Sequence, residues 1–463
     1  MSSHELMSIS PLDGRYAKIS APLQSHFSEF AYLRARAVFE IDYLIALSQD
    51  LQLTRPFSDN ELGFLRAMQD NFSIDDARQI KDLESKTRHD VKAIEYFLRA
   101  QLASTSLADV IPWLHFGLTS ADVNLTVQAI ALRDARNSIT LPALDKILTQ
   151  LADLIDRHKS TPMLARTHGQ AAVPTTFGKE MAVFLGRLMR QRKALTAHKF
   201  DAKLTGAVGS YNALVAAFPL VDWQAFSKAF LEKLGLVASN TTTQILPFDN
   251  WLTYFQTTHL TNSVLIDLAQ DMWRYISDDY LKLRVVGDEV GSSTMPQKVN
   301  PIDFENAEGN FGIANTLFEQ YIRKLPISRL QRDLSDSTVR RTFGTALGHS
   351  LIGYASISQG LDRIEANQAG MSSDLEAHWE IVAEGAQTIL RASSVSSGYD
   401  QLKIFSRGKE VTQDMYIQWI EQLDVDLTIQ AKLRTLTPLN YIGLSQQIAE
   451  KVLAEFDQHS NTN

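Results

Sequence analysis

Apolar residues recur at three- and four-residue steps through the middle of the chain, as one buried face of an α-helix requires. The repeat is clearest over residues 141–155, 177–189 and 252–283. The stretch from Trp251 to Val286 contains no internal glycine or proline, and it therefore predicts an unusually long helix. A small globular domain cannot cover such a rod, so the pattern is typical of a helical bundle. Alternating strand patterns are few, and the expected fold class is all-α.

Composition sets limits on the partners that this chain can bind. Its 463 residues are enough for two or three domains or one elongated helical body, and 44% hydrophobic with 21% charged residues is ordinary for a globular protein. The 53 acidic and 45 basic residues give a net charge of −8, which argues against a broad nucleic-acid-binding surface. Any phosphate binding must therefore be local.

The absence of cysteine and of long apolar segments indicates in which cell compartment the protein is expected. The chain contains no cysteine, so disulfides, thiolate metal sites and a cysteine nucleophile cannot contribute. No uninterrupted apolar segment is long enough to span a bilayer, and the N-terminal MSSHELMSIS does not read as a secretory signal. We therefore expect a cytoplasmic protein with neither membrane nor nucleic-acid partners.

Three polar segments interrupt the helical pattern. Residues 114–124 read LHFGLTSADVN, residues 165–180 read ARTHGQAAVPTTFGKE, and residues 291–301 read GSSTMPQKVNP. Gly291 and Pro296 punctuate the third segment, which predicts a mobile connector able to reach over a small anion. The three segments together predict one assembled site.

His168 is well suited to proton transfer, because the ordinary pKa of histidine lies near neutrality. A lone histidine is more often structural than catalytic. Here Thr167 and Gln170 offer hydrogen bonds, and Gly169 permits the close approach of a ligand. The helix that follows is expected to begin between Pro174 and Thr176.

Charge stabilisation and helix capping explain four further polar residues. Lys298 and Asn300 offer an ammonium and an amide that could stabilise developing negative charge, although a solvated lysine and a capping asparagine are the structural alternative. Thr119 and Ser120 precede Asp122 in a pattern typical of a capped helix start. Free N–H groups at such a start can also hold a carboxylate.

The three polar segments, in this order, resemble the conserved regions of the fumarase/aspartase superfamily, whose members eliminate fumarate from succinyl-type substrates. Three further blocks are similar to the adenylosuccinate lyase family in particular: SPLDGRYA at residues 10–17, TRHDVKAIEYF at 87–97 and QRDLSDSTVRR at 331–341. The resemblance runs nearly end to end.

The resemblance implies an architecture of three helical domains. An N-terminal helical domain is expected over residues 1–110, a central long-helix bundle that carries the signature motifs over 111–365, and a C-terminal helical domain over 366–463. The resemblance further implies a homotetramer whose active sites are shared between subunits, with the long-helix bundle at its core.

General acid–base catalysis without a cofactor or metal is the chemistry that the resemblance implies. His168 would protonate the leaving nitrogen, and Ser292, activated as an alkoxide, would remove the proton beside the succinyl carboxylate. From the residues alone, a Gly-Ser-Ser sequence reads as a flexible turn. Glu305 would pair with His168, and it could equally be a first-turn acid that stabilises a helix N-terminus. The implied catalytic set is His168, Ser292, Lys298, Glu305 and His89.

A larger set of residues is implied to bind the nucleotide and the succinyl arm. Arginine and hydroxyl groups suit phosphate oxygens through charge-assisted hydrogen bonds, although each such residue alone would more often be a surface charge. His115, beside Phe116, is also compatible with a core histidine. Gln297 replaces the histidine usual in the family, and the resulting MPQK is the form common in argininosuccinate lyases. Ala171 replaces a frequent proline, and Arg88 occupies a variable position before His-Asp. The implied binding residues are Arg15, Tyr16, Arg88, Asp90, His115, Thr119, Ser120, Thr167, Gln244, Ser293, Asn300, Asn306, Arg332, Ser337 and Arg341.

The implied activity is cleavage of adenylosuccinate to AMP and fumarate, and the parallel cleavage of the succinylated aminoimidazole carboxamide ribonucleotide in purine synthesis. Another lyase of the superfamily, such as argininosuccinate lyase or fumarase, would use the same three polar segments but would not require the other three blocks. An inactive helical scaffold would tend to lose His168, Ser292 or Lys298, and all three are present.

Overall fold

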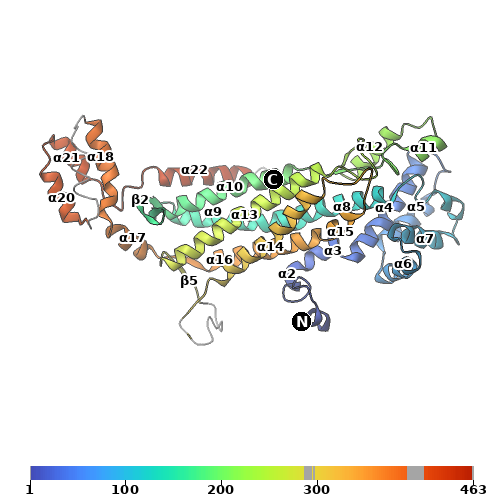
Figure 1. The fold of residues 1–463 in the computed structure, drawn as a ribbon, viewed down its shortest axis with the longest axis horizontal. Coiled ribbons are helices and arrows are strands. Elements are labelled where there is room, and N and C mark those ends of the chain that lie inside the picture. The colour runs from blue at the N-terminus through green and yellow to red at the C-terminus, as the bar shows by residue number, and fades with distance from the viewer. Residues whose placement is uncertain (1, 286–294, 296–297, 394–410, 461–463) are drawn as a thin grey trace. The chain divides into compact units, whose positions relative to one another are not determined.

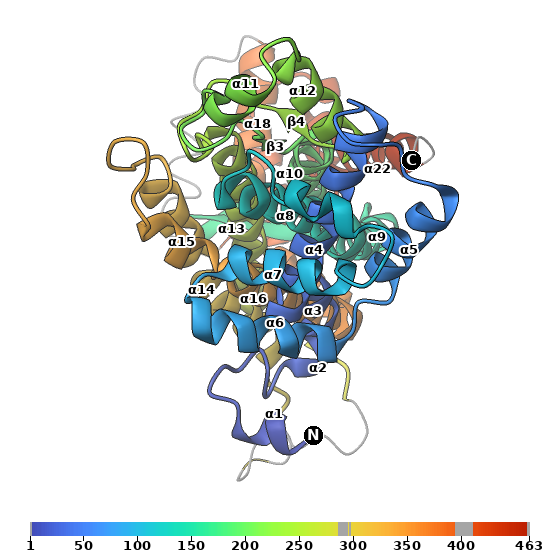
Figure 2. The ribbon, with the colours of Figure 1, turned by 90° about the vertical axis from the view of Figure 1, so that its right-hand side faces the viewer.

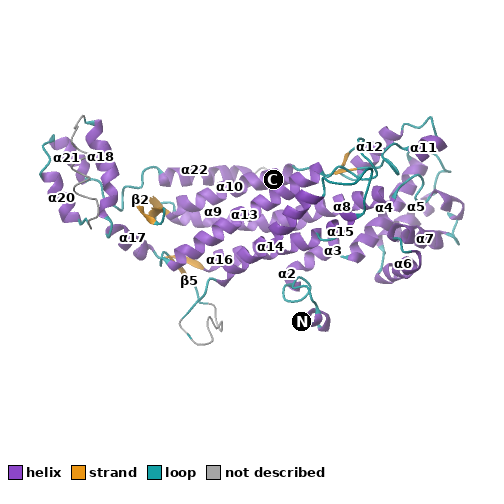
Figure 3. Ribbon diagram, viewed as in Figure 1, coloured by secondary structure: helices purple, strands orange, loops and turns teal. Residues whose placement is uncertain are grey.

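The computed structural model describes residues 2–285, 295, 298–393 and 411–460. Helices account for most of these residues, and the described strands form three two-stranded sheets (Figure 1, Figure 3). The all-α prediction is therefore confirmed. None of the described helices is long and apolar enough to cross a membrane.

The chain forms two compact units, each assembled from three separate stretches of sequence. Unit 1 comprises Met1–Ala143, Lys193–Asn262 and Asn310–Ile352, and unit 2 comprises Leu144–Arg192, Ser263–Gly309 and Gly353–Asn463. The limits of the units fall inside helices α9 (Leu141–His158), α10 (Phe177–Ala197), α13 (Asp249–Ser277), α14 (Ile302–Lys324) and α16 (Phe343–Arg363). The predicted division into three domains stays a prediction.

Four helices from the N-terminal part of unit 1 lie close together (Figure 2), and their residues form most of an apolar core. Serine caps begin three of them: the side chains of Ser28, Ser58 and Ser73 each accept a hydrogen bond from a backbone N–H in the first turn. Their apolar faces meet at fully buried leucine and isoleucine side chains, such as Leu65 and Ile80. The helices are α4 (Glu29–Gln49), α5 (Asp59–Asp70), α6 (Ile74–Thr87) and α7 (Asp90–Leu102).

The rest of unit 1 contains helix α8 (Ser120–Ala135), whose apolar residues are almost all buried, and several shorter elements. A short parallel pair joins β3 (Asp201–Ala202) to β4 (Val237–Ala238). The other elements are α1 (Ser3–Met7), α2 (Ala17–Ser20), η1 (Ala21–Leu23), α3 (Gln24–Phe27), η2 (Ala108–Trp113), η3 (Arg136–Thr140), α11 (Asn212–Ala217), α12 (Trp223–Lys233) and α15 (Ser335–Arg340).

Aromatic side chains hold the long helices of unit 1 together. Phe255 of α13 stacks with Phe318 of α14, and the two ring centroids lie 5.8 Å apart. Phe343 of α16 lies 4.9 Å from Phe255 and 5.0 Å from Tyr321. Because aromatic pairs add specific geometry to a large buried apolar area, this cluster fixes how the three helices pack within unit 1.

Unit 2 contains two antiparallel strand pairs, which join β1 (Pro162–Thr167) to β2 (Gln170–Thr176) and β5 (Leu281–Leu283) to β6 (Ile364–Ala366). An apolar core cluster in unit 2 includes fully buried leucine, isoleucine and valine side chains and the ring of Tyr416. The helices around this core are α17 (Gln368–Glu376), η4 (Trp379–Val382), α18 (Ala383–Ala392), α20 (Gln413–Glu421) and α21 (Leu427–Arg434), and α22 (Ser445–Ser460) follows them in the chain.

The predicted long helix is shorter than its glycine- and proline-free sequence suggests. Helix α13 ends at Ser277, nine residues before Val286, and Leu281–Leu283 forms strand β5 instead. Asp279 stops the helix, because its backbone has a φ of 59° and its carbonyl accepts a hydrogen bond from Asn367. Helix α10 begins at Phe177, directly after the predicted range.

Candidate active site

The described site residues divide between the two units. Unit 1 carries Arg15, Tyr16, Arg88, His89, Asp90, His115, Thr119, Ser120, Gln244, Arg332, Ser337 and Arg341, and unit 2 carries Thr167, His168, Lys298, Asn300, Glu305 and Asn306. Ser292, Ser293 and Gln297 lie outside the described residues. The roles assigned to these positions from the sequence remain predictions, and the geometry of each unit shows which of them meet.

The predicted helix start at Thr119 is confirmed. Ser120 is the first residue of α8, and the N–H of Thr119 donates to Oδ2 of Asp122 at 2.9 Å. Gly117, just before the start, has a φ of 68°, a conformation that suits glycine. The first N–H groups of a helix have no partners inside the helix, so the α8 N-terminus is well suited to hold a carboxylate.

Two separately predicted segments meet at this helix start. His89 caps helix α7, and its Nδ1 accepts the backbone N–H of Lys92 at 3.1 Å. In the neutral ring the proton therefore lies on Nε2, which is 3.5 Å from Oγ of Ser120. The TRHD block and the LTSAD segment thus place an imidazole N–H and a serine hydroxyl next to one another.

Arg36 of helix α4 supports both segments, and sequence reasoning missed it. Its guanidinium contacts the Asp90 carboxylate at 3.2 Å and donates from Nε to Oδ1 of Asn124 at 2.7 Å. Partial burial alone would raise the pKa of Asp90. The positive charge of Arg36 outweighs burial and lowers this pKa overall. The Val91 N–H, His89 and Arg341 act in the same direction as Arg36. Asp90 therefore stays charged and ties α7 to α4.

His115 forms a buried pair with Glu40, another residue that sequence reasoning missed. Nδ1 of His115 lies 2.6 Å from Oε1 of Glu40, whose side chain is 1% exposed. Burial alone would lower the pKa of His115, but the Glu40 carboxylate outweighs it and raises that pKa. Oε2 of Glu40 is buried and has no hydrogen-bond partner in the described part of the chain.

Three predicted site residues other than glycine have a positive φ. Seven described non-glycine residues have a positive φ, and three of them are Arg88 (52°), His115 (57°) and His168 (54°). Such backbone is costly for residues with a Cβ atom and is often found at ligand-binding positions. At Arg88, the C-cap of helix α6, and at His168, in the turn between β1 and β2, the local structure accounts for the positive φ. At His115 the strain favours a functional interpretation.

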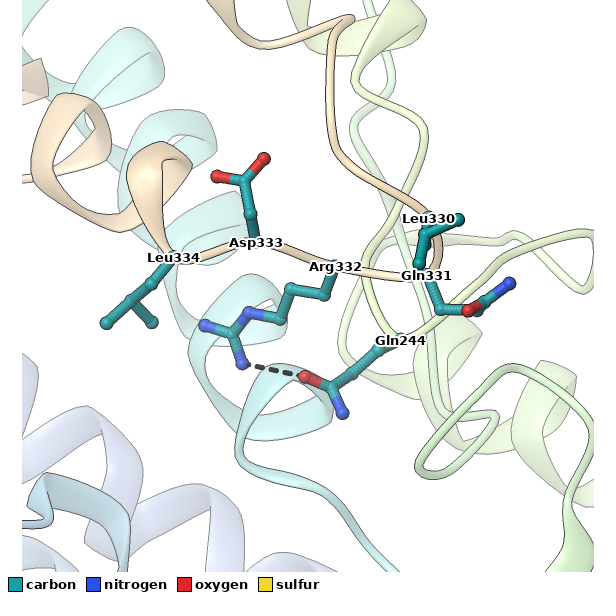
Figure 4. Close-up of a pocket in the computed structure, with 6 residues that line it drawn as sticks. All are labelled: Gln244, Leu330, Gln331, Arg332, Asp333 and Leu334. Atoms are coloured by element: carbon teal, nitrogen blue, oxygen red, sulfur yellow. Dashed lines mark hydrogen bonds between the residues drawn. The ribbon is translucent and has the colours of Figure 1, made fainter.

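A pocket of about 440 Å³ lies between the QRDLSDSTVRR block and Gln244 (Figure 4). Nη1 of Arg332 donates to Oε1 of Gln244 at 3.0 Å, and Nε2 of Gln244 donates to the carbonyl of Ala207 at 3.0 Å. Nε of Arg332 is buried and has no acceptor among the described residues. An unpaired guanidinium N–H beside a pocket is suited to an anionic ligand such as phosphate.

The same pocket also carries an acidic residue. Hydrogen bonds from the hydroxyl and N–H of Ser335 and from the N–H of Arg329 hold the pKa of Asp333 well below its usual range. Its carboxylate points away from the Arg332 guanidinium, while the Gln244 side chain points toward it (Figure 4). The positive side of the pocket is therefore formed by Arg332.

A second pocket, of about 270 Å³, joins the N-terminal SPLDGRYA block to the QRDLSDSTVRR block within unit 1. Ser10 and Asp13 line it together with Arg341 of the second block. Arg340, the preceding residue, is buried and pairs with Asp336, so these adjacent arginines differ in role. Arg15 and Tyr16 do not line this pocket, and the Arg15 guanidinium lies 5.9 Å from the Tyr16 ring centroid.

In unit 2, His168 occupies the turn of a β-hairpin rather than a loop before a helix. His168 and Gly169 connect β1 to β2 and have φ values of 54° and 74°, as two-residue hairpins of type I′ require. The His168 side chain is exposed and has no hydrogen-bond partner among the described residues. Arg166 anchors the hairpin through a 2.7 Å hydrogen bond to Asp374 of α17.

Glu305 lies in the first turn of α14, as its structural interpretation predicts. Its Oε1 accepts a hydrogen bond from Nε1 of Trp273 at 3.1 Å. Trp273 belongs to the apolar repeat over residues 252–283, which predicts a buried side chain, but this side chain is 44% exposed. Within the described chain Glu305 makes no hydrogen bond to His168. Their predicted pairing therefore stays a prediction.

Asn306 and Lys298 of unit 2 each make a hydrogen bond within this unit. Nδ2 of Asn306 donates to Oγ of Ser356 at 2.8 Å, which links α14 to α16 within unit 2. Lys298 is exposed, and its backbone N–H donates to the carbonyl of Met295 at 3.1 Å. Among the residues that the structure describes, no group of three histidine, aspartate or glutamate side chains could hold a metal ion.

Family models match most of the chain. One described as "Lyase" matches residues 25–313, and one described as "Adenylosuccinate lyase C-terminal" matches residues 328–442. The chain is 42% identical over 450 residues to an adenylosuccinate lyase of Haemophilus influenzae, covering 96% of this chain and 99% of the relative. It is 40% identical over 446 residues to the adenylosuccinate lyase of Escherichia coli K12, covering 96% and 98%.

Two solved structures have a similar fold. The crystal structure of a fumarate lyase from Mesorhizobium sp. gives a TM-score of 0.75 at 18% identity and covers 94% of this chain and 97% of that one. The 3-carboxy-cis,cis-muconate lactonizing enzyme of Pseudomonas putida gives a TM-score of 0.76 at 18% identity and covers 95% and 98%. At this identity the likeness concerns the fold alone.

Proposed function

We propose that this chain, which belongs to the adenylosuccinate lyase family of the fumarase/aspartase superfamily, cleaves adenylosuccinate to AMP and fumarate. The same elimination would release fumarate from the succinylated aminoimidazole carboxamide ribonucleotide. The chain is then a lyase that acts on nucleotide substrates in purine synthesis, and its relatives at about 40% identity support this assignment over nearly the full length.

One observation carries the choice of a nucleotide substrate. His89 belongs to a block typical of adenylosuccinate lyases, and Ser120 belongs to a segment that the whole superfamily shares; their side chains lie 3.5 Å apart. This approach supports the proposal that the α8 helix start, which would bind a carboxylate, and the TRHD block, which would bind the nucleotide, act on one substrate. The arginine pocket at Arg332 supplies a third element, which suits a phosphate.

The proposed reaction is a proton-coupled elimination. Ser292 removes a proton from the carbon next to the succinyl carboxylate, and the electron pair of that C–H bond becomes the new C=C bond. The C–N bond breaks toward nitrogen, and His168 donates the proton that the leaving nitrogen takes up. Lys298 and Asn300 stabilise the negative charge that develops on the carboxylate, which is greater in the transition state than in the substrate.

Unit 1 would contact the two ends of the substrate. Thr119 and Ser120 would bind a succinyl carboxylate with the hydroxyls and free N–H groups at the α8 N-terminus. Arg332 and Arg341 would bind the phosphate, with Gln244 holding the Arg332 guanidinium. The positive φ of His115 supports a binding role for this residue as well.

We further propose a cytoplasmic homotetramer in which different chains contribute to each active site. The exposed His168 has no partner in the described part of its own chain, so a residue of another subunit could meet it. Apolar side chains on the long helices are also exposed, including Val183 (45%), Leu260 (47%) and Ile313 (50%). A subunit interface would bury them.

The function is tested by following fumarate formation with adenylosuccinate, argininosuccinate and malate as separate substrates. Turnover of adenylosuccinate alone supports the proposal. Turnover of argininosuccinate or malate in its place would assign the chain to another reaction of the superfamily, and no turnover of any substrate by folded protein would support an inactive scaffold.

A further inference from the structure

A charged pair is buried directly behind the α8 helix start. The side chains of Lys203 and Asp122 are both 0% exposed, and Nζ of Lys203 donates to Oδ1 of Asp122. Oδ1 of Asp122 also accepts the N–H of Thr205 at 3.1 Å, and Oδ2 accepts the N–H of Thr119 at 2.9 Å. One carboxylate therefore holds the 203–205 segment and the cap of α8 together.

Stability alone gives little reason for this pair. Moving two charges out of water costs free energy that their attraction often fails to recover, and well-packed apolar replacements are frequently at least as stable. Burial, reinforced by the nearby charge of Arg332, lowers the pKa of Lys203, while Asp122 opposes the change.

The segment after Lys203 continues to the arginine pocket at Arg332 through hydrogen bonds. Oγ1 of Thr205 lies 2.7 Å from Oγ1 of Thr242, and the carbonyl of Ala207 accepts from Gln244. Gln244 in turn accepts from Arg332 at 3.0 Å. Residues 203–207 thus connect the α8 helix start to the arginine pocket, and we name them the strut.

Close backbone packing keeps the strut region in one conformation. Gly209 has a φ of 86°, and a Cβ atom added there would lie 2.1 Å from the carbonyl oxygen of Thr242. Gly206, inside the strut, has a φ of 78°, and its carbonyl accepts a second hydrogen bond from Lys203 at 3.3 Å. A side chain at Gly209 would collide with the Thr242 backbone, and at Gly206 the positive φ alone disfavours a side chain.

We propose that Asp122 and Lys203 are positioning residues that set the distance between the succinyl-binding helix start and the phosphate-binding arginine pocket. This inference rests on the proposed function, because it assumes that one substrate reaches both places. A substrate that spans them must meet both at once, and a misplacement near 1 Å at a reacting centre can lower the rate about 10²-fold. A ligand that occupies only one end has no such requirement.

The test is the double variant Asp122→Asn/Lys203→Met, which removes both charges and nearly preserves side-chain volume. With wild-type activity on adenylosuccinate established first, we expect kcat/KM for adenylosuccinate to fall about 10²-fold. The affinity for AMP, measured by calorimetry, should stay within about 3-fold of wild type, because the Arg332 side chain is unchanged. Circular dichroism and thermal unfolding would check that the variant is folded.

A second variant keeps the inference open to test if the first does not fold. Thr242→Val removes the hydroxyl contact to Thr205 while keeping the side-chain shape, and we expect kcat/KM to fall about 5-fold with AMP affinity unchanged. Arg55→Met/Glu61→Gln is the matched control: it removes a partly buried pair of unit 1 that contacts no predicted site residue. That control should lower thermal stability and leave kcat/KM unchanged.

Three results would overturn the inference. One is a folded Asp122→Asn/Lys203→Met protein with wild-type kcat/KM. Another is an equal loss of AMP affinity and of adenylosuccinate turnover, which would indicate general loosening of unit 1. The third is a control variant that loses as much activity as the test variants. Absence of adenylosuccinate cleavage by the wild-type protein would instead refute the proposed function, and the two failures are therefore distinguishable.

Discussion

Removing the guanidinium of Arg332 tests the phosphate end of the proposed site. In the described structure, Nη1 of this side chain donates to Gln244, and the buried Nε has no acceptor. A phosphate that accepts hydrogen bonds from the remaining N–H groups would satisfy them, and Arg332→Gln would remove those donors and the positive charge. We therefore expect weaker binding of ligands that carry a phosphate.

The magnitude follows from the type of hydrogen bond that is lost. A hydrogen bond to a charged group contributes about 1.5–3 kcal/mol, which corresponds to an affinity change of roughly 10- to 150-fold. One N–H of Arg332 already binds Gln244, so the lower half of this range is expected. KM for adenylosuccinate should rise by about 10- to 30-fold, and kcat should change little, because phosphate lies away from the reacting carbon atoms.

Calorimetry with AMP and with adenosine separates the phosphate contact from every other effect. Arg332→Gln should weaken AMP binding by about the same factor as KM and leave adenosine binding unchanged. Arg329→Gln is the matched control, because Arg329 is exposed, lies in the same segment and does not line the pocket. Equal losses for AMP and adenosine, or an equal effect of Arg329→Gln, would refute the assignment of Arg332 to phosphate.

Three further predictions address catalysis, pH dependence and assembly. His168→Ala should keep the fold and lower turnover of adenylosuccinate by about 10²- to 10⁴-fold, and near-normal turnover would remove His168 from the mechanism. Burial lowers the pKa of His115, but Glu40 outweighs burial and raises this pKa in the folded chain. The pairing therefore stabilises the fold fully below about pH 6.5, the ordinary pKa of histidine, and this stabilisation is lost as the pH rises through the raised pKa. Glu40→Gln should therefore lower the midpoint of thermal unfolding more at pH 6 than at pH 9, and an equal shift at both would contradict this reasoning. Inactive His168→Ala and Ser292→Ala chains, refolded together as mixed tetramers, should regain up to about a quarter of wild-type activity, whereas confirmed mixing without recovery would exclude a shared site.

Local patterns predict the parts of this structure that depend on neighbouring residues. The start of α8 at Ser120 follows from a Thr-Ser-x-Asp capping sequence, and Asp122 does accept the Thr119 N–H. The apolar faces of α9 and α10 follow from their helical repeat, since Leu151 and Leu185 are both fully buried. These features need only the geometry of a single helix.

Local patterns fail where a distant partner decides the conformation. The absence of glycine and proline extends the predicted α13 helix to Val286, but the carbonyl of Asp279 accepts from Asn367, 88 residues away, and the helix ends at Ser277. The His-Gly turn at His168 lacks the Asn-Gly signal of a two-residue hairpin. Its strands become recognisable only through their pairing with one another.

Buried charges show most clearly why sequence alone could not complete the site. Arg36 and Glu40 lie four residues apart on an otherwise apolar stretch of α4. From the sequence they would be taken for polar residues at the solvent-exposed edge of an amphipathic helix. Their partners are far away in sequence: Arg36 binds Asn124 across 88 residues, and Glu40 binds His115 across 75. Only the folded chain reveals that both charges point toward predicted site segments.

The placement of these charges suggests a common reason for them. Glu40 holds His115, Arg36 holds Asp90, and Lys203 holds Asp122, so each pair joins a residue outside the predicted segments to one inside them. A buried ion pair is a costly way to stabilise a core, but its direction and length are well defined. Because binding and elimination depend on geometry at the scale of an ångström, these pairs are better explained by the positions they impose than by the stability they add.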